Sequence, residues 1–277
     1  MVRNKPIKPF LRWAGSKRQI RSKLSSYWSD DHKRYLEPFL GSGSLYFYIN
    51  PKKAILGDIN FDLIETYEQI KKNLKSVYSI LLKMPEGKNE YYKIRSKDKR
   101  KLTQEERAAR FIYLNRYSFN GLYRTNQNGE FNVPYGGEKT GQLPSRELLE
   151  LCSGALQTAQ LISGDFELVL NQAKSGDFIY LDPPYKIAEK RVFTEYDKSS
   201  FREFDIKRLR NWLDKLTEMG IVFLLSYADC EEAEFLKDGY DADEIMVRRN
   251  IAGFSKHRRS AGELLVTNVE IVNRKVE

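Results

Sequence analysis

The tetrapeptide Asp182–Tyr185, with the sequence DPPY, directly follows a short apolar run, Phe178–Leu181. Two consecutive prolines remove two backbone donors and hold the chain extended, which leaves carbonyl oxygens as acceptors beside the Asp182 carboxylate. The exocyclic amino group of a nucleobase is a poor nucleophile because its lone pair is delocalised into the ring. If Asp182 and the Pro183 carbonyl accept both amino hydrogens, electron density returns to the nitrogen, which can then attack an electrophilic methyl group. Tyr185 offers a flat face on which an extruded base can stack.

A second motif, Glu37–Gly43, has the pattern E-P-F-x-G-x-G and precedes the apolar segment Leu45–Ile49. Glycines at such a strand-to-helix junction let the backbone approach a ligand closely. Asp58 ends the next apolar run, where an acidic side chain can accept hydrogen bonds from ribose hydroxyls. No third glycine completes a G-x-G-x-x-G pattern, which argues against a dinucleotide-dependent dehydrogenase. Phe39 fits cofactor contact and core packing equally well.

A third candidate is the segment Trp13–Lys17, with the sequence WAGSK. Its aromatic, small and cationic residues suit a lid over a bound nucleoside and an ion pair with a ligand carboxylate. Taken alone, the segment fits an exposed tryptophan beside a solvated lysine better.

These motifs require strands that bring them to one edge of a sheet. Short apolar runs ending in acidic or glycine-rich turns recur along the chain and are typical of parallel strands. Between the runs, apolar residues keep helical spacing, with Asp205 as the expected N-cap of the later helix. The runs are Tyr35–Glu37, Ala54–Asp58, Leu161–Asp165, Phe178–Asp182 and Ile221–Ser226, and the helical positions are Tyr67, Ile70, Leu74, Val77 and Leu81, then Ile206, Leu209, Leu213 and Leu216.

The alternation of strands and helices predicts an α/β fold with a doubly wound, mostly parallel sheet that binds ligands at its carboxyl edge. The last two apolar runs, Glu244–Val247 and Leu264–Val272, have no strong helix between them and predict an antiparallel hairpin, which gives about seven strands. Residues 71–154 break the rhythm, being basic and tyrosine-rich and then rich in Gly, Asn and Pro. We therefore expect a core domain of residues 1–66 and 160–277 with an inserted, mainly helical domain of residues 67–159.

The composition points to a polyanionic partner. The chain carries a formal net charge of +9, with a pI near 9.3. Nucleic acid becomes the leading partner because aromatic residues lie among its basic clusters. No apolar run approaches the roughly 18 residues of a membrane span, and the polar amino terminus predicts a cytoplasmic protein. The clusters are Lys97, Lys99, Arg100 and Lys101, and Arg248, Arg249, Lys256, Arg258 and Arg259.

Two cysteines far apart and two histidines predict neither a disulfide nor a metal site. Cys152 and Cys230 are expected to be inert thiols. Neither cysteine lies in a Pro-Cys loop, which excludes the cysteine nucleophile that C5-cytosine methylation requires.

Two longer blocks, Leu114–Arg124 (LNRYSFNGLYR) and Gly129–Gly136 (GEFNVPYG), carry a family resemblance. Together with the three motifs above, they make the chain resemble the Dam-type DNA adenine methyltransferases, the alpha group of amino-methyltransferases. The resemblance implies a Rossmann-like methyltransferase sheet whose inserted domain reads double-stranded DNA. It also implies S-adenosylmethionine as the cofactor and transfer of its methyl group to N6 of a flipped adenine, often in GATC.

The resemblance extends to individual residues. It implies cofactor contacts by Trp13, Lys17, Glu37, Phe39, Gly41, Gly43, Asp58, Asp165, Phe166 and Asp182. It implies that Asp182, Pro183, Pro184 and Tyr185 hold the flipped adenine. It implies DNA contacts by Arg12, Arg116, Phe119, Asn120, Leu122, Arg124, Pro134 and Lys139.

Three alternatives stay open at this point. The D-P-P-Y chemistry also serves N4-cytosine methylation, although the Asn115–Arg124 block favours adenine. A catalytically inactive DNA-binding protein of the same fold is a second alternative, against which the intact Asp58, Asp182 and Tyr185 speak. An RNA methyltransferase is a weaker one. The resemblance implies a monomer or a weak dimer.

Overall fold

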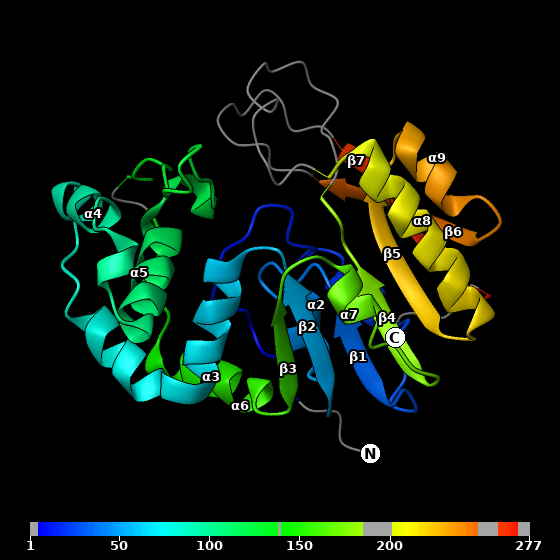
Figure 1. Cartoon of the computed structure of the whole chain (residues 1–277), viewed down its shortest axis with the longest axis horizontal. Helices are drawn as coiled ribbons and strands as arrows, with labels where there is room; N and C mark the ends of the chain where they lie inside the picture. The colour runs from blue at the N-terminus through cyan, green and yellow to red at the C-terminus, as the bar shows by residue number, and fades with distance from the viewer. Residues whose placement is uncertain (1–4, 138–139, 185–200, 249–259, 271–277) are drawn as a thin grey trace. The chain divides into compact units, whose positions relative to one another are not determined.

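The computed structural model describes residues 5–137, 140–184, 201–248 and 260–270 and divides into two compact units (Figure 1). Each unit has a buried aromatic centre. Phe10 packs edge-on against Tyr67 in the first unit, and Tyr35 stacks on Phe178 in the second. The first unit comprises Met1–Arg18, Gly41–Asn50 and Gly57–Gly164, and the second comprises Gln19–Leu40, Pro51–Leu56 and Asp165–Glu277.

Seven strands make up the sheet of the described chain: β1 (Arg34–Glu37), β2 (Ala54–Asp58), β3 (Ala159–Ser163), β4 (Asp177–Leu181), β5 (Val222–Ala228), β6 (Asp241–Arg248) and β7 (Ser260–Thr267). Their order is β3-β2-β1-β4-β5-β7-β6. β1 pairs in parallel with β2 and β4, and β4 with β5, whereas β7 runs antiparallel to both β5 and β6. The predicted mostly parallel sheet with an antiparallel hairpin is confirmed.

The strand order reverses direction at β1 and β4. From β1 the order continues through β2 to β3, and from β4 it continues to β5. Such a switch point is where open α/β sheets form a crevice beyond the carboxyl ends of their strands. β4 is buried along its whole length, as expected for a strand with neighbours on both sides.

The helices of the first unit are α2 (Ser44–Ile49), α3 (Phe61–Leu82), α4 (Lys88–Arg95), η1 (Lys99–Lys101), α5 (Gln104–Tyr117), η2 (Phe119–Gly121) and α6 (Arg146–Leu156). α3 packs against α5 and α6 (Figure 1). Asn60 begins α3 by accepting the Leu63 N–H at 3.1 Å. A capping box begins α5, because the Thr103 hydroxyl accepts the Glu106 N–H while the Glu106 carboxylate accepts the Thr103 N–H.

The helices of the second unit are α1 (Arg21–Ser25), α7 (Glu167–Leu170), α8 (Glu203–Glu218) and α9 (Glu231–Lys237), and α8 lies along β5 (Figure 1). The predicted N-cap of α8 is wrong. Asp205 lies inside the first turn, where its carboxylate accepts the Arg202 backbone N–H at 3.0 Å. The acidic side chain therefore stabilises the helix start from the third helical position and not from the cap.

The third strand also differs from its predicted bounds of residues 161–165. β3 ends at Ser163, because Gly164 turns the chain with φ of 140°, in the left-handed half of the backbone map that favours glycine. Asp165 and Phe166 consequently follow the strand and lead into α7.

Candidate functional site

Asp182 lies at the carboxyl end of β4, immediately after its last residue, Leu181. The Ser226 hydroxyl donates to Asp182 Oδ1 at 3.4 Å and lies 3.0 Å from the Tyr180 hydroxyl. Burial raises the pKa of Tyr180, and the negative charge of Asp182 raises it further. Pro183 is buried and Pro184 is exposed, whereas Tyr185 lies outside the described residues.

Glu37 ends β1, the strand beside β4 at the switch point. It is buried, and its carboxylate accepts the Tyr35 hydroxyl at 2.9 Å. Burial raises the pKa of Tyr35, as do the charges of Glu37 and, more weakly, Asp182. Two acidic groups thus stand at the carboxyl ends of adjacent strands in one unit.

Phe39 and Phe166 form a stacked aromatic pair, with ring centroids 5.4 Å apart and planes inclined by 28°. The guanidinium of Arg208 lies 4.7 Å from the centroid of the Phe166 ring. This half-buried ring packs on another ring, as the core-packing alternative expected, and cofactor contact by Phe39 stays a prediction.

Arg208 of α8 also holds the Asp165 carboxylate, with bonds of 2.6 and 3.1 Å to its two oxygens. It pairs with Glu167 at 2.8 Å as well, and its hydrogen bond lowers the pKa of that carboxyl. The sequence reasoning missed Arg208. No local signal marks it, because it lies 43 residues from Asp165 and within an ordinary amphipathic helix.

In the first unit, Asp58 joins the glycine motif to the turn that follows β2. Its Oδ2 accepts the Gly41 N–H and its Oδ1 accepts the Asn60 N–H, both at 2.9 Å. Burial raises the pKa of Asp58, against these two hydrogen bonds. A carboxylate has about four acceptor sites, so each oxygen retains one for a ligand hydroxyl. This arrangement fits a ribose with two adjacent hydroxyls.

The glycines of the motif have the positive φ angles that favour glycine, 49° at Gly41 and 62° at Gly43. A Cβ on Gly41 would lie 2.7 Å from the indole ring of Trp13, so only glycine permits this approach. Trp13 in turn stacks on Tyr123, with centroids 5.9 Å apart and planes inclined by 19°. Lys17 is only 6% exposed, so it is not the solvated lysine that the segment alone suggested.

Asn115, which the sequence reasoning did not single out, fixes the backbone near several residues that are expected to contact DNA. The Asn115 amide accepts the Arg12 N–H at 2.8 Å and donates to the Arg12 carbonyl at 2.7 Å. It also donates to the Gly121 carbonyl at 3.4 Å, and so ties η2 to the amino-terminal segment. Asn115 is buried in α5, and its side-chain amide forms hydrogen bonds with the backbone of two loops.

Phe119, Asn120, Arg124 and Pro134 are exposed, and Leu122 is partly so. Asn120 adopts the left-handed conformation, with φ of 55°. Arg124 donates through Nε to Asn132 Oδ1 at 2.8 Å, and its two terminal nitrogens have no hydrogen-bond partner among the described residues. Arg116 donates to the Gln142 carbonyl at 2.7 Å, and burial together with Arg12 and Arg18 lowers its pKa. Lys139 lies outside the described residues.

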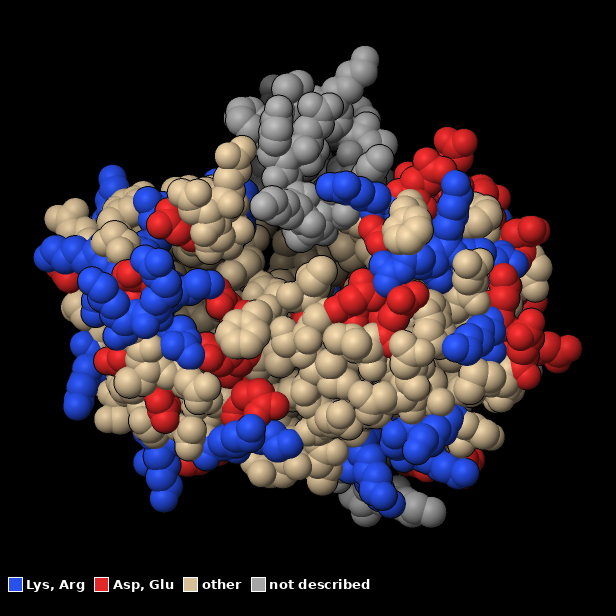
Figure 2. Space-filling view, in the orientation of Figure 1, with Lys and Arg blue, Asp and Glu red and all other residues tan. Residues whose placement is uncertain are grey.

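Basic side chains gather over the α4 and α5 part of the first unit (Figure 2). Within the run at residues 97–101, Lys99 pairs with Asp62 at 2.8 Å and keeps 44% of its side chain exposed, so its contact with solvent or phosphate stays a prediction. Arg100 pairs with Asp98 at 2.9 Å, with 86% of its side chain exposed. Lys97 and Lys101 are exposed. In the second cluster, residues 249–259 and the Arg248 side chain lie outside the description.

Cys152 is buried and Cys230 is partly so, and both are free thiols. Burial raises the pKa of Cys152 to about 12 and also raises that of Cys230. Within the described ranges, no group of three His, Cys, Asp or Glu side chains is placed to hold a metal ion. None of the helices in that part of the chain combines the length and apolar character that a membrane crossing needs.

The chain is similar to known proteins over most of its length. Residues 13–252 match the family described as D12 class N6 adenine-specific DNA methyltransferase. The chain is 36% identical to the Type II methyltransferase M1.LlaDCHI of Lactococcus lactis subsp. cremoris, with 95% of each chain covered. It is 35% identical to the Type II methyltransferase M.MjaIII of Methanocaldococcus jannaschii, covering 95% of this chain and 99% of that one.

The chain is also 30% identical to a DNA adenine methylase of Haemophilus influenzae, covering 93% of this chain and 92% of that one. These matches decide between the two bases left open above in favour of adenine. They also decide for an enzyme over an inactive binding protein. The chain belongs to the D12 class N6 adenine-specific DNA methyltransferases.

Proposed function

We propose that this chain transfers a methyl group from S-adenosylmethionine to N6 of adenine within GATC in double-stranded DNA. The target adenine is rotated out of the helix, and the protein acts as a monomer or a weak dimer. The observation that carries the proposal is Asp182 at the carboxyl end of β4, beside β1 at the switch point of the sheet. The domain limits of 1–66 and 160–277 for the core and 67–159 for the recognition domain remain part of it.

The methyl donor is bound by the cofactor-contact residues that the family resemblance implies. Asp58 accepts the two ribose hydroxyls on the acceptor sites that Gly41 and Asn60 leave open. Trp13 covers the ligand, and Lys17 pairs with its carboxylate. The cofactor supplies an electrophilic methyl group on a sulfonium, and the remaining set of Glu37, Phe39, Gly43, Asp165, Phe166 and Asp182 borders it.

The acceptor is held by Asp182–Tyr185. Asp182 and the Pro183 carbonyl accept the two N6 hydrogens, Pro184 keeps the turn extended, and the Tyr185 ring stacks on the flipped base. N6 forms a bond to the methyl carbon as the sulfur–methyl bond breaks. The nitrogen then gives up one proton, with the Asp182 carboxylate as its first acceptor. Hydrogen bonds that strengthen as charge develops on N6 lower the barrier.

The recognition segment reads the site. Because its Nε is held by Asn132, Arg124 has its terminal nitrogens available for O6 and N7 of a guanine. The exposed Phe119 and Asn120 and the partly exposed Leu122 reach the bases of the same site. Arg12, Arg116, Pro134 and Lys139 contact the DNA and set its register.

Mapping modified bases in DNA from cells that express the chain tests the product and its site together. We expect N6-methyladenine in GATC, and none in cells that express Asp182→Ala. Methylated cytosine, or methyladenine in an unrelated sequence, would contradict the proposal. A fluorescent adenine analogue at the target position should brighten on binding if the base leaves the stack. Sedimentation of the complex on a duplex with one site should give one chain per DNA.

A further inference from the structure

The ring of Tyr123 lies where the recognition segment meets the amino-terminal segment. It stacks on Trp13, with centroids 5.9 Å apart and an angle of 19° between the rings. Phe111 and Phe131 pack against the same tyrosine at 5.3 and 5.7 Å. All four rings belong to the first unit. The stack therefore joins the residue beside Arg124 to the residue that the proposed function places over the methyl donor.

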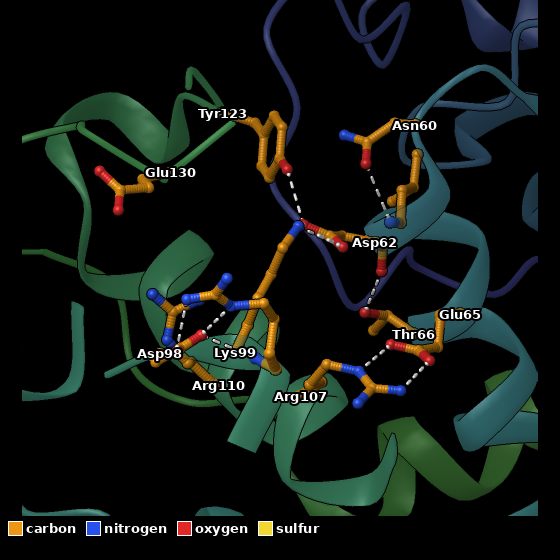
Figure 3. A network of polar contacts seen from close by, with 12 residues as sticks. Asn60, Asp62, Glu65, Thr66, Asp98, Lys99, Arg107, Arg110, Tyr123 and Glu130 are labelled. Atoms are coloured by element: carbon orange, nitrogen blue, oxygen red, sulfur yellow. Dashed lines mark hydrogen bonds and ion pairs between the residues drawn. The ribbon is translucent and has the colours of Figure 1, made fainter. Parts of the chain in front are cut away.

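The hydroxyl of Tyr123 is also held in place, by a hydrogen bond to a side chain of α3. It donates to Asp62 Oδ2 at 3.1 Å, and Lys99 donates to both oxygens of the same carboxylate at 3.0 and 2.8 Å (Figure 3). Burial raises the pKa of Tyr123, and Asp62 raises it further, so the hydroxyl keeps its proton and remains a donor at neutral pH. Asp62 stands in the first turn of α3, four residues after Asp58.

At the opposite end of the stack, Trp13 lies against Gly41 of the glycine motif. The Trp13 ring lies so close to Gly41 that a Cβ there would be 2.7 Å from it. The Gly41 N–H is bonded to Asp58, and its carbonyl accepts the Tyr67 hydroxyl, both at 2.9 Å. Movement of the indole is therefore limited by Gly41, whose backbone N–H is hydrogen-bonded to the Asp58 carboxylate that is proposed to bind ribose.

Arg124, the neighbour of Tyr123, is held at both its backbone and its side chain. The Asn132 N–H donates to the Arg124 carbonyl at 3.0 Å, and the Asn132 side chain accepts the Arg124 Nε at 2.8 Å. A shift of Arg124 toward a guanine is consequently transmitted to the Tyr123 backbone, since the two residues share a peptide bond.

We propose that Tyr123 is a positioning residue that couples reading of the target sequence to binding of the methyl donor. The inference rests on the proposed function, which assigns Arg124 to the DNA and Trp13 to the donor. When Arg124 engages its base pair, the Tyr123 ring is held in the position that supports Trp13. Coupling of this kind is reciprocal, so bound donor also improves binding of the cognate site.

The coupling factor is the ratio of two dissociation constants for S-adenosylhomocysteine, which is used so that no turnover occurs. The first is measured by calorimetry with the chain alone. It is divided by the second, which is measured with a saturating GATC duplex. We expect a ratio of at least about fivefold for the wild type, the lower end of typical allosteric coupling. A duplex with the site scrambled should give a ratio near one.

Tyr123→Leu removes the stack and the hydroxyl, and the expected ratio falls to within twofold of one. Tyr123→Phe keeps the ring and loses the hydroxyl with its bond to Asp62, and should lower the ratio at least twofold. Tyr240→Phe is the matched control, because the Tyr240 hydroxyl donates to Asp214 at 2.6 Å in the second unit, and its ratio should equal that of the wild type. A merely structural role of Tyr123 would weaken both dissociation constants equally and leave the ratio unchanged.

A wild-type ratio in both Tyr123 variants would overturn the coupling, as would a ratio of one in the wild type. If thermal melts show that Tyr123→Leu does not fold, Tyr123→Phe decides alone. A wild-type chain that binds no S-adenosylhomocysteine would instead refute the proposed donor, and the coupling would fall with it.

Discussion

Asp58→Asn is the sharpest test of the donor site because the change preserves shape and alters only charge and hydrogen-bonding sense. Each Asp58 oxygen accepts one backbone N–H, from Gly41 or from Asn60, at 2.9 Å. An asparagine has one oxygen and one NH₂ group. Whichever way the amide is turned, it places a donor against one of these two backbone donors.

The cost follows from that geometry. One backbone N–H loses its partner, which should destabilise the ligand-free protein by about 1–3 kcal/mol. One of the two proposed bonds to ribose is lost and the other is no longer charge-assisted, for a total of about 2–4 kcal/mol. Since 1.4 kcal/mol is about tenfold in affinity, the dissociation constant for S-adenosylmethionine should rise roughly 30- to 1,000-fold.

Thermal melts with and without S-adenosylmethionine measure both effects. At a concentration of 100 times the wild-type dissociation constant, the ligand should stabilise the wild type by about 2.7 kcal/mol. A variant that binds 100-fold more weakly gains only about 0.4 kcal/mol at that concentration. Asp98→Asn is the matched control, since Asp98 also accepts an N–H two residues on, from Arg100 at 3.0 Å. A ligand affinity within threefold of wild type in Asp58→Asn would refute the ribose assignment.

The pH dependence of the same measurement has a defined sign. Burial raises the pKa of Asp58, so its carboxylate takes up a proton at a higher pH than an ordinary aspartate. The protonated form cannot accept both hydroxyls as a charged group. The stabilisation by ligand should therefore be complete well above the raised pKa and decline as the pH falls through it. For the ligand-free fold the sign is opposite, because the raised pKa favours the protonated folded state on acidification.

Three further outcomes are expected. Asp182→Ala should lower the methylation rate at least about 10²-fold, the effect of losing a transition-state hydrogen bond, and retention of more than a tenth of the rate would contradict its role. Arg124→Ala should relax discrimination at one G·C pair by about 1–3 kcal/mol, whereas an equal loss of rate on every site variant would make it a phosphate contact. Arg208→Met should cost about 1–2 kcal/mol of unfolding free energy after solvent screening. Arg208 lowers the pKa of Glu167, so this stabilisation is present above the pKa of the carboxyl in the unfolded chain and is lost as the pH falls through the lowered pKa of the folded state. Urea melts in a pH series should show this pH-dependent stabilisation in the wild type alone.

The strands and the motifs at their ends were predictable because their signals are local. An apolar run such as Phe178–Leu181 is contiguous in the chain, and the Asp182 that follows must emerge at the strand's carboxyl end wherever the strand lies. The same holds for Asp58 after β2. The start of α8 was not predictable from Asp205 alone, because an acidic residue stabilises a first turn both as the cap and at the third position.

Partners of charged side chains were not predictable, because they are chosen by packing between distant segments. Arg208 meets Asp165 across 43 residues, and nothing in the helical pattern of α8 distinguishes it from Arg210, which pairs with Asp214 one turn later. Asn115 presents the same difficulty, since its contact with Arg12 spans 103 residues. Fold topology decides such contacts, and a single sequence does not encode them locally.

The basic run at residues 97–101 shows how the partner of a charged side chain affects the expected binding of DNA. By sequence, Lys99 and Lys101 are equivalent members of one basic cluster, and each would add about 0.9 to the slope of log affinity against log salt if it met a phosphate. In the structure Lys99 is held by both oxygens of Asp62, which also accepts Tyr123, whereas Lys101 is exposed. Lys99→Ala should therefore leave the salt slope within error of wild type, while Lys101→Ala lowers it by up to about 0.9. If the two variants flattened the slope equally, Lys99 would have to leave Asp62 on binding DNA, and the rigid support inferred for Tyr123 would not exist in the complex.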